Sequence, residues 1–396
     1  MPSRPLLVAA MLLGAAPAVA GPPRPEPLAP LPATTLDRLA PLARTADLAL
    51  IESRADGKVK QMTTLAFAAA PPATVRQALL QLERYPEFVR NLKQSQVTPQ
   101  SDGSTIHAYR ISYGIYTVFG RLQYLPQPPT TPGVPGAVEV IEPEPDSPRH
   151  FRWEFRPALG GTLIVLYGYT PIPDDGFMSR FLRTAPTLEH GLALLAQLTL
   201  LKAIQRRAEQ LAPGTAVTSA APPTGGLDPL LQRGVVAILR SRGDHLADLS
   251  LVARSRASTA ALLTLAAQPA SWAGAWPTVT RAADLGPQEG LATVEIEQSL
   301  PLLSWTSVWG IRRDATAVDL FALSGDLRGD RLRWDVRPVD GGSEVVLRSQ
   351  VHYEAGSLVV RQLYRLEPFF EYGVNVGLNL VLLEALRQHA APGRGG

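Results

Sequence analysis

The six histidines are the side chains that could do acid–base chemistry or bind a metal near neutral pH. They stand at His107, His150, His190, His245, His352 and His389. None belongs to a His-Glu-x-x-His pattern or to another metal-ligand spacing. His190 follows Glu189, but neighbouring residues of a helix point in different directions. The sequence therefore predicts no catalytic residue, no metal site and no cofactor, and it favours a packed or surface role for each histidine.

Other signals of catalysis or nucleotide binding are also missing from the sequence. There is no Gly-x-Ser-x-Gly elbow, no Gly-x-Gly-x-x-Gly turn and no phosphate-binding loop. The chain has 0 cysteines, which excludes disulfides, thiolate metal sites and a cysteine nucleophile. These absences favour a binding protein over a hydrolase or a nucleotide enzyme. They leave open a cyclase, which can act by folding its substrate in a shaped pocket with few proton-transfer groups.

Aromatic and amide side chains are the best candidates for contacts with an apolar ligand. A buried tyrosine or tryptophan combines a large ring with one polar atom, and a buried amide without a partner costs about 1–3 kcal/mol. The candidate ligand-binding residues are Trp153, Tyr109, Tyr113, Tyr167, Tyr169, Gln197, Trp305, Trp309, Trp334, Asn375 and Asn379. The tryptophans could instead be core residues of their sheets, and the amides could face solvent or a protein partner.

A repeated segment shows how these candidates are positioned. RWEFRPALGG begins at Arg152 and RWDVRPVDGG begins at Arg333, and six of the ten residues are identical. Further matches at a similar offset pair ALIESRADG from Ala49 with AILRSRGDH from Ala237, ALLQLERYPEF from Ala78 with ALLTLAAQPAS from Ala261, and RTAPTLEHG from Arg183 with RLEPFFEYG from Arg365. Matches that keep one order at a nearly constant offset indicate a duplicated domain of about 165 residues, not a solenoid.

Both copies have the same order of predicted elements. In the first copy, strands at 49–54 and 58–69 precede a helix over 71–85, which starts with prolines where proline is tolerated. Further strands follow, and a long helix over 187–211 closes the copy. The second copy closes with a helix over 369–389. The segment GLALLAQLTLL in the first closing helix is apolar nearly all round, which is typical of a helix buried on both sides.

The repeated segment itself predicts a strand with two different faces. FRWEFRP alternates, so we expect Arg152, Glu154 and Arg156 on a solvated face and Trp153 on the face that points inward. The second copy repeats this pattern around Trp334. The Gly-Gly pair after each strand predicts a hairpin turn.

The segments outside the two repeated domains are identified by their composition. MPSRPLLVAAMLLGAAPAVA has a basic residue before a short apolar run and small residues before Gly21, which is the pattern of a signal peptide. Dense prolines in GPPRPEPLAPLPATT predict an extended tether, and APGTAVTSAAPPTGG predicts a linker. We therefore expect a periplasmic or secreted bacterial protein, cleaved after Ala20. The predicted segments are a signal peptide at 1–20, a tether at 21–45, domains at 46–212 and 228–391, and a linker at 213–227.

The segment FAAAPPATVRQALLQLERYPEFVRNLKQSQV at 67–97 carries a family resemblance. Its alanine–proline turn at 70–73 and its YPEF segment at 85–88 resemble the opening of START-like domains. That superfamily includes polyketide cyclase/dehydrase-type, coenzyme-Q-binding and lipid-transfer proteins. The YPEF signature is absent from the second copy, where the resemblance depends on the repeat. The resemblance implies an α+β fold of two tandem helix-grip domains, each a curved antiparallel sheet wrapped on a long C-terminal helix.

A sheet that wraps around a helix leaves space for a small molecule between them. We predict non-enzymatic binding or transport of an apolar molecule such as a lipid, a quinone or a polyketide. The alternatives are a cyclase or aromatase-type enzyme and a protein-interaction module without a ligand. A cavity of at least ~300 Å³ in either copy would favour a ligand. The net charge of +3 and the lack of a Lys/Arg block argue against nucleic acid, while transient membrane contact through apolar loops stays open.

Overall fold

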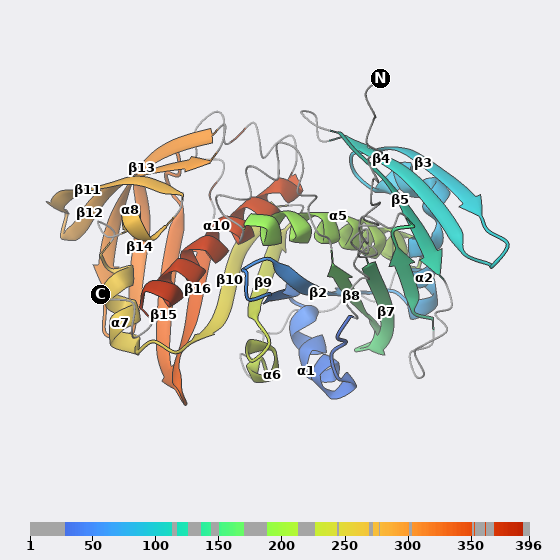
Figure 1. Ribbon diagram of the computed structural model, residues 1–396, viewed down its shortest axis with the longest axis horizontal. Helices are drawn as coiled ribbons and strands as arrows, with labels where there is room; N and C mark the ends of the chain where they lie inside the picture. Colours follow the sequence, from blue (N-terminus) through green and yellow to red (C-terminus); the bar gives the residue numbers. More distant parts are fainter. Residues whose placement is uncertain are drawn as a thin grey trace, which may run out of the picture.

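The chain forms two halves that lie side by side (Figure 1). We refer to residues 46–212 as the first half and to residues 228–391 as the second half. The computed structural model describes residues 28–112, 117–125, 136–143, 150–169, 188–212, 226–243, 245–268, 272–276, 278–300, 303–350, 352, 361 and 368–390.

The first half follows the predicted order of elements, after a helix α1 (Ala33–Ala43) that precedes it. Its elements are β1 (Asp47–Ser53), β2 (Val59–Ala68), α2 (Pro72–Leu80), η1 (Leu82–Arg84), α3 (Tyr85–Phe88), β3 (Leu92–Pro99), β4 (Thr105–Ser112), β5 (Thr117–Leu125), β6 (Val138–Ile141), β7 (His150–Ala158), β8 (Gly161–Tyr169) and α5 (Leu188–Leu211). The single helix predicted over 71–85 is interrupted at Gln81, whose ψ of 49° leaves the helical region.

The second half repeats this order. Its elements are α6 (Asp228–Leu231), β9 (Val235–Arg242), β10 (His245–Ser255), α7 (Thr259–Ala266), α8 (Trp272–Ala275), β11 (Val279–Gln288), β12 (Leu291–Leu300), β13 (Leu303–Arg313), β14 (Ala317–Gly325), β15 (Arg331–Val339), β16 (Gly342–Gln350) and α10 (Pro368–His389). The hairpins predicted after each repeated segment are confirmed. In the first, Leu159 and Gly160 have φ of 49° and 80°, which suits a tight turn between twisted strands.

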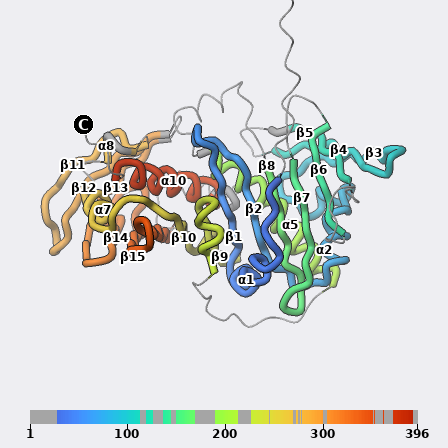
Figure 2. Tube along the Cα trace, turned by 60° about the horizontal axis from the view of Figure 1, so that its bottom comes forward, coloured from blue at the N-terminus to red at the C-terminus, as the bar shows by residue number. Residues whose placement is uncertain are grey.

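The strands of both halves form one continuous sheet, where the sequence predicts two separate ones. The order is β11-β12-β13-β14-β15-β16-β10-β9-β1-β2-β8-β7-β6-β5-β4-β3. The halves join where β1 pairs with β9 in antiparallel orientation, and Figure 2 shows these strands side by side in the middle of the molecule. Ala49 lies opposite Ala237 there, and the two occupy equivalent positions in the repeat. The junction is therefore nearly symmetric about an axis between these alanines.

The two closing helices also meet at equivalent residues. Gly191 in α5 and Gly373 in α10 match in the repeat, and their backbones approach closely. A Cβ atom on Gly191 would overlap the carbonyl oxygen of Gly373, and one on Gly373 would lie 2.8 Å from the Cβ of Leu195. Glycine at both positions is what allows the helices to come together here.

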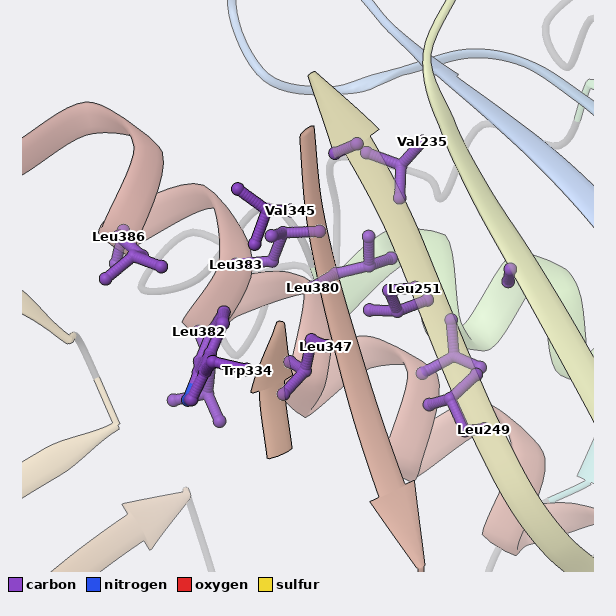
Figure 3. Close-up of a cluster of buried hydrophobic side chains, with 14 of the residues drawn as sticks. Val235, Leu249, Leu251, Trp334, Val345, Leu347, Leu380, Leu382, Leu383 and Leu386 are labelled. Atoms are coloured by element: carbon purple, nitrogen blue, oxygen red, sulfur yellow. The ribbon is translucent and has the colours of Figure 1, made fainter. Parts of the chain in front are cut away.

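Helix α5 packs against both halves, as its apolar middle predicts. Leu194 and Leu198 belong to the core of the second half, whereas Leu201 and Ile204 belong to the core of the first. In the second half, α10 lies along β10, and Figure 3 shows Leu380 of α10 among the apolar side chains of that core. We call the face of the sheet that packs on α5 and α10 the inner face.

Residues 33–43 of the predicted tether form helix α1, so the expected extended segment is wrong there. Pro32 is the N-cap of this helix and only Pro41 lies inside it, close to its end. Proline is tolerated at the start of a helix, whereas Pro41 lies within the last turns and gives up one backbone hydrogen bond there. The helix forms despite this loss, along the apolar spacing. Leu36 and Leu39 are buried with Val165 of β8 on the outer face of the sheet.

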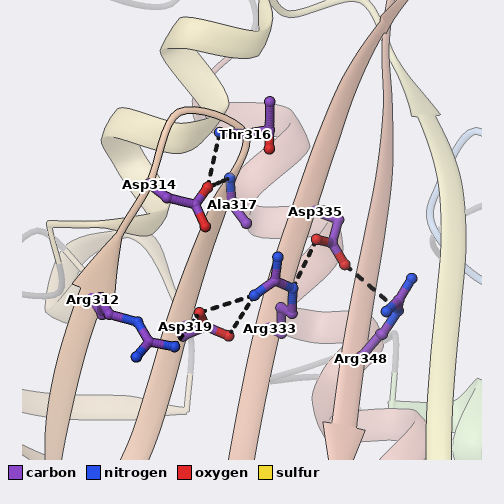
Figure 4. A network of polar contacts seen from close by, with 8 residues as sticks. All are labelled: Arg312, Asp314, Thr316, Ala317, Asp319, Arg333, Asp335 and Arg348. Atoms are coloured by element: carbon purple, nitrogen blue, oxygen red, sulfur yellow. Dashed lines mark hydrogen bonds and ion pairs between the residues drawn. The ribbon is translucent and has the colours of Figure 1, made fainter.

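The predicted solvated face of the first repeated segment is also wrong. Arg152 and Glu154 on β7 are 7% and 1% exposed, and they form an ion pair of 2.8 Å. Glu154 lies opposite Val165, which is part of the cluster beneath α1. In the second half, the equivalent Arg333 keeps a side-chain exposure of 37% and pairs with neighbouring carboxylates on an open face (Figure 4).

Candidate functional site

The inner face of the first half is built from cross-strand rows of apolar side chains. Trp153 on β7 lies between Leu166 of β8 and Val138 of β6. All three are 2% exposed or less, and they belong to one core with residues of α2 and α5. Trp153 is thus a core residue on the inner face of the sheet, which agrees with its predicted inward orientation.

Gln197 places a polar group against the apolar inner face of the first half. It lies on α5, is 3% exposed, and its Oε1 accepts a hydrogen bond of 3.2 Å from the hydroxyl of Thr64 on β2. Its side-chain amide occupies the space over Gly168 that a larger residue would fill. Farther along α5, Gln205 donates to the carbonyl oxygen of Phe67, and Glu209 accepts from the backbone N–H of Ala69. These bonds fix the helix along β2.

A second polar group lies on the inner face at β3 and β4. His107 is 2% exposed, and its Nε2 lies 2.8 Å from the hydroxyl of Ser95 on the neighbouring strand. The same hydroxyl donates to the carbonyl oxygen of Leu82 at 2.6 Å. The other ring nitrogen, Nδ1, is buried and has no hydrogen-bond partner within the described residues. Burial lowers the pKa of His107 to about 4, so the ring is neutral at pH 7.

Three tyrosine rings surround His107. The ring centroids of Tyr85, Tyr109 and Tyr124 lie 5.3, 5.7 and 5.9 Å from the imidazole. Burial raises the pKa of the Tyr85 and Tyr124 hydroxyls, so both keep their protons. Tyr85 donates to the carbonyl oxygen of Leu79. The ring of Tyr109 covers Gly120 on β5, where any side chain would overlap it.

Burial decreases along the inner face beyond this cluster. Tyr109 and Ile111 follow His107 on the same face of β4, and both are only half-buried. Phe88 of α3 and Val97 of β3 are also half-buried against the same core. The aromatic and apolar lining therefore extends from a buried histidine to solvent, which is the arrangement of a site that receives an apolar group.

The second half has a different interior. Its core contains the indole rings of Trp272, Trp276, Trp309 and Trp334 together with many leucines. Figure 3 shows Trp334 among several of these leucines. The rings of Trp272 and Trp276 lie 3.8 Å apart by their centroids. Trp334 is 0% exposed, and its Nε1 has no hydrogen-bond partner within the described part of the chain. Polar side chains are buried in this half too, among them Glu371, Asn375 and Asn379 of α10.

The comparisons with known proteins find relatives by structure alone. No family model matches the chain, and no curated protein matches it. The di-domain ARO/CYC protein StfQ from the steffimycin biosynthetic pathway covers 83% of this chain with 97% of its own, at 14% identity and a TM-score of 0.31. The di-domain ARO/CYC protein BexL from the BE-7585A biosynthetic pathway covers 85% with 100% of its own, at 12% identity and a TM-score of 0.28.

A single-domain match is a STAR-related lipid transfer protein from Xanthomonas axonopodis, which covers 39% of this chain with 93% of its own at 12% identity and a TM-score of 0.31. StfQ and BexL are described as di-domain proteins. Since the identities and TM-scores are this low, the description of the site rests on the residues of this chain alone.

The interior of the first half brings together only some of the predicted ligand-binding residues. Trp153, Tyr109 and Gln197 all lie on its inner side. Tyr167 does not, because it points to the outer face, where its hydroxyl accepts a hydrogen bond of 3.1 Å from the backbone of Leu31. Tyr113 and the side chain of Tyr169 lie outside the described residues.

In the second half, the predicted residues lie in the core or bond to nearby protein groups, although Nε1 of Trp334 and Oδ1 of Asn379 are buried without a hydrogen-bond partner in the described residues. Trp309 and Trp334 are core residues. The half-buried Trp305 donates to the side chain of Gln298 at 2.9 Å. Asn375 and Asn379, for which the sequence left solvent, protein or ligand open, each donate to the backbone carbonyl one turn earlier in α10.

Sequence reasoning missed the cluster around His107. A usable signal was present, because His107, Tyr109 and Ile111 alternate along one strand and therefore share a face. Ser95 and Tyr85 could not be added, since only the pairing of β3 with β4 and the turn after α2 bring them to that face.

Other features of the described residues do not add a second site of this kind. An open depression of about 420 Å³ lies between α7 and the end of α10, next to Leu265 and His389, and the core residue Trp272 donates to the carbonyl oxygen of Leu265. No group of three or more metal-binding side chains occurs in the described part of the chain. No helix found there is long and apolar enough to cross a membrane.

Proposed function

We propose that the first half binds an apolar small molecule between the inner face of its sheet and helices α2 and α5, without converting it. The observation that carries this proposal is the change in burial along one face of β4, from His107 to the half-buried Tyr109 and Ile111. A sealed core would bury these apolar side chains fully. A ligand site instead combines an apolar lining with a few placed polar groups, here His107 and Gln197.

The class of ligand follows from the lining. Aromatic rings and aliphatic side chains line the inner face of this half, and they suit a molecule such as a lipid, a quinone or a polyketide. The proposal assigns the second half a supporting role, because its interior is filled by indoles and leucines.

A second candidate function is a cyclase or aromatase-type enzyme. It is favoured by the hydrogen-bonded pair of His107 and Ser95, which puts a titratable group inside the site. General acid–base catalysis works best when the pKa of the group lies near the working pH. The pKa of His107 is lowered to about 4, which makes it a weak base and favours binding over catalysis.

Native mass spectrometry of the full chain tests the binding proposal. The protein is purified from a bacterial extract, its bound molecules are extracted with solvent, and its mass is compared with that of two variants. Tyr109→Ala removes a half-buried ring from the inner face of the first half, and Trp305→Ala removes a half-buried ring from the second half as the matched control.

We expect a reproducible adduct that Tyr109→Ala weakens about tenfold and Trp305→Ala leaves unchanged. A clean apo mass after incubation with lipid, quinone and polyketide mixtures would contradict the proposal. An adduct lost only in Trp305→Ala would move the site to the second half. A bound molecule whose mass changes with time would favour the enzyme.

The proposal places this binding in the periplasm, in keeping with the N-terminal sequence pattern. We expect the mature chain to begin at Gly21. N-terminal sequencing of the protein from a periplasmic fraction checks this, and an intact Met1 on the cellular protein would contradict it.

A further inference from the structure

The hydrogen bonds of Ser95 fix the position of the proton on His107. The Ser95 hydroxyl has one hydrogen and two close neighbours, the carbonyl oxygen of Leu82 at 2.6 Å and Nε2 of His107 at 2.8 Å. A carbonyl oxygen can only accept, so the hydroxyl hydrogen goes to Leu82. Nε2 must then carry a hydrogen and donate it to Ser95. In the neutral ring, the other nitrogen Nδ1 is left as an acceptor.

This acceptor is in an unusual position. His107 is 2% exposed, yet Nδ1 has no partner within the described residues. Leaving a buried acceptor unsatisfied costs about 1–3 kcal/mol. The side chains that face the ring are Ser95, Tyr85, Tyr109 and Tyr124, and none of them carries a charge at neutral pH.

We infer that Nδ1 of His107 is the recognition point for a hydroxyl or N–H group on the ligand. This inference rests on the proposed function and narrows its ligand to a neutral, apolar molecule with one such donor, of the kind a phenol offers. A carboxylate is disfavoured, since it would meet the Nδ1 lone pair, and the side chains described in contact with the ring, Ser95 and the three tyrosines, offer no positive charge. A ring next to the donor would pack among the three tyrosine rings.

Two probes that differ only in the donor test the inference. The full chain is titrated with 2-naphthol and with 2-methoxynaphthalene, and the fluorescence of each probe is followed. We expect 2-naphthol to bind about tenfold more tightly than its methyl ether, because only the hydroxyl can satisfy Nδ1. In His107→Phe, which keeps an aromatic ring, the preference should fall below about twofold.

The state of the histidine is measured independently in the unaltered protein. Nitrogen NMR of protein labelled in its histidines separates a protonated from an unprotonated ring nitrogen. We expect His107 to carry its proton on Nε2, and the Nδ1 resonance to shift when 2-naphthol is added. This measurement decides the matter if His107→Phe does not fold.

The outcomes separate this inference from the proposed function. Equal binding of both probes, or a proton on Nδ1, would overturn the inference while the binding proposal stands. An Nδ1 resonance that stays unchanged at saturating 2-naphthol would indicate a bound water only, and would also overturn it. Failure of both probes to bind would count against the proposed function and this inference together.

Discussion

The same ten-residue segment stands in two different environments, in the first half and in the second. On β7, helix α1 covers the neighbouring outer face, and Glu154 is buried between Arg152 and Arg156. On β15, the equivalent Asp335 remains on an open face with Arg333 and Arg348 (Figure 4). The repeated sequence therefore determines that a strand forms and which side chains share a face. The elements that pack against that face determine how deeply each charged side chain is buried, and so how much it contributes to stability.

The inner faces of the halves differ in a corresponding way. The first half surrounds a buried acceptor, Nδ1 of His107, with tyrosines, and the second surrounds a buried donor, Nε1 of Trp334, with apolar side chains. The two halves thus share the arrangement of strands and differ in the buried polar groups of their interiors. This difference favours the proposal that the ligand binds in the first half.

Substitution of the equivalent acids is expected to have the largest effect. Glu154→Gln removes a charge that is 1% exposed and leaves two arginines without it, so we expect a loss of about 3–5 kcal/mol in the free energy of unfolding. Asp335→Asn is the matched change at 27% exposure and should cost less than about 1 kcal/mol. Urea denaturation of both variants measures this, and equal losses would break the comparison.

The pH dependence of stability is the next largest effect. The pKa of His107 is about 4 in the folded chain and near 6.5 when unfolded, so below pH 6.5 the unfolded chain binds the proton first. The contribution of about 3 kcal/mol is complete above pH 6.5 and is lost as the pH falls to 4. We expect His107→Phe to remove this component from a series of urea denaturations. An unchanged slope between pH 6.5 and 4 would contradict the assignment.

The glycine crossing tests whether the halves act as one unit. Gly191→Ala places a methyl group against the backbone of α10, and we expect it to cost about 1–3 kcal/mol. Gln210→Ala on the exposed end of the same helix is the control and should be neutral. Because the two cores share α5, thermal unfolding of Gly191→Ala should stay a single transition. Two separated transitions would show that the halves are independent.

The smallest effect is expected for an exposed arginine of the second half. Arg348 is 57% exposed and lies 3.5 Å from Asp335, which keeps its closer partner Arg333. Arg348→Ala should change the free energy of unfolding by less than about 0.5 kcal/mol, and 0.5 M salt should erase the difference. A larger, salt-resistant loss would mean that the open face of the second half is less solvated than its exposure indicates.

Local patterns in the sequence predicted most of the strands and both closing helices. They did not predict that β1 and β9 pair, although both strands contain a continuous apolar run, which indicates burial on both faces. The prolines before 33 obscured the spacing of Leu36, Leu39 and Leu42, which marks one side of α1. In α1, the prediction gave more weight to the prolines than to the spacing of the leucines. In β1 and β9, it did not use the continuous apolar run as a sign of burial on both faces.

The candidate site was predictable only in part. The inward direction of Trp153 follows from alternation, and Gln197 stands out as a polar residue in an apolar helix. Tyr167 was wrongly grouped with them, since the face of β8 that it occupies depends on where α1 packs. His107 was set aside because no catalytic or metal spacing surrounds it. Its environment is assembled from three separate segments that only the fold brings together.

The pairing of β1 with β9 has a consequence for solubility. Each half taken alone would present a second unpaired edge strand, β1 or β9, with a row of free N–H and C=O groups and apolar side chains on both faces. Such an edge is a template for self-association. In the tandem chain, each half covers the edge of the other, and only the more polar β3 and β11 remain as the ends of the sheet. Duplication in one chain thus protects the protein from aggregation.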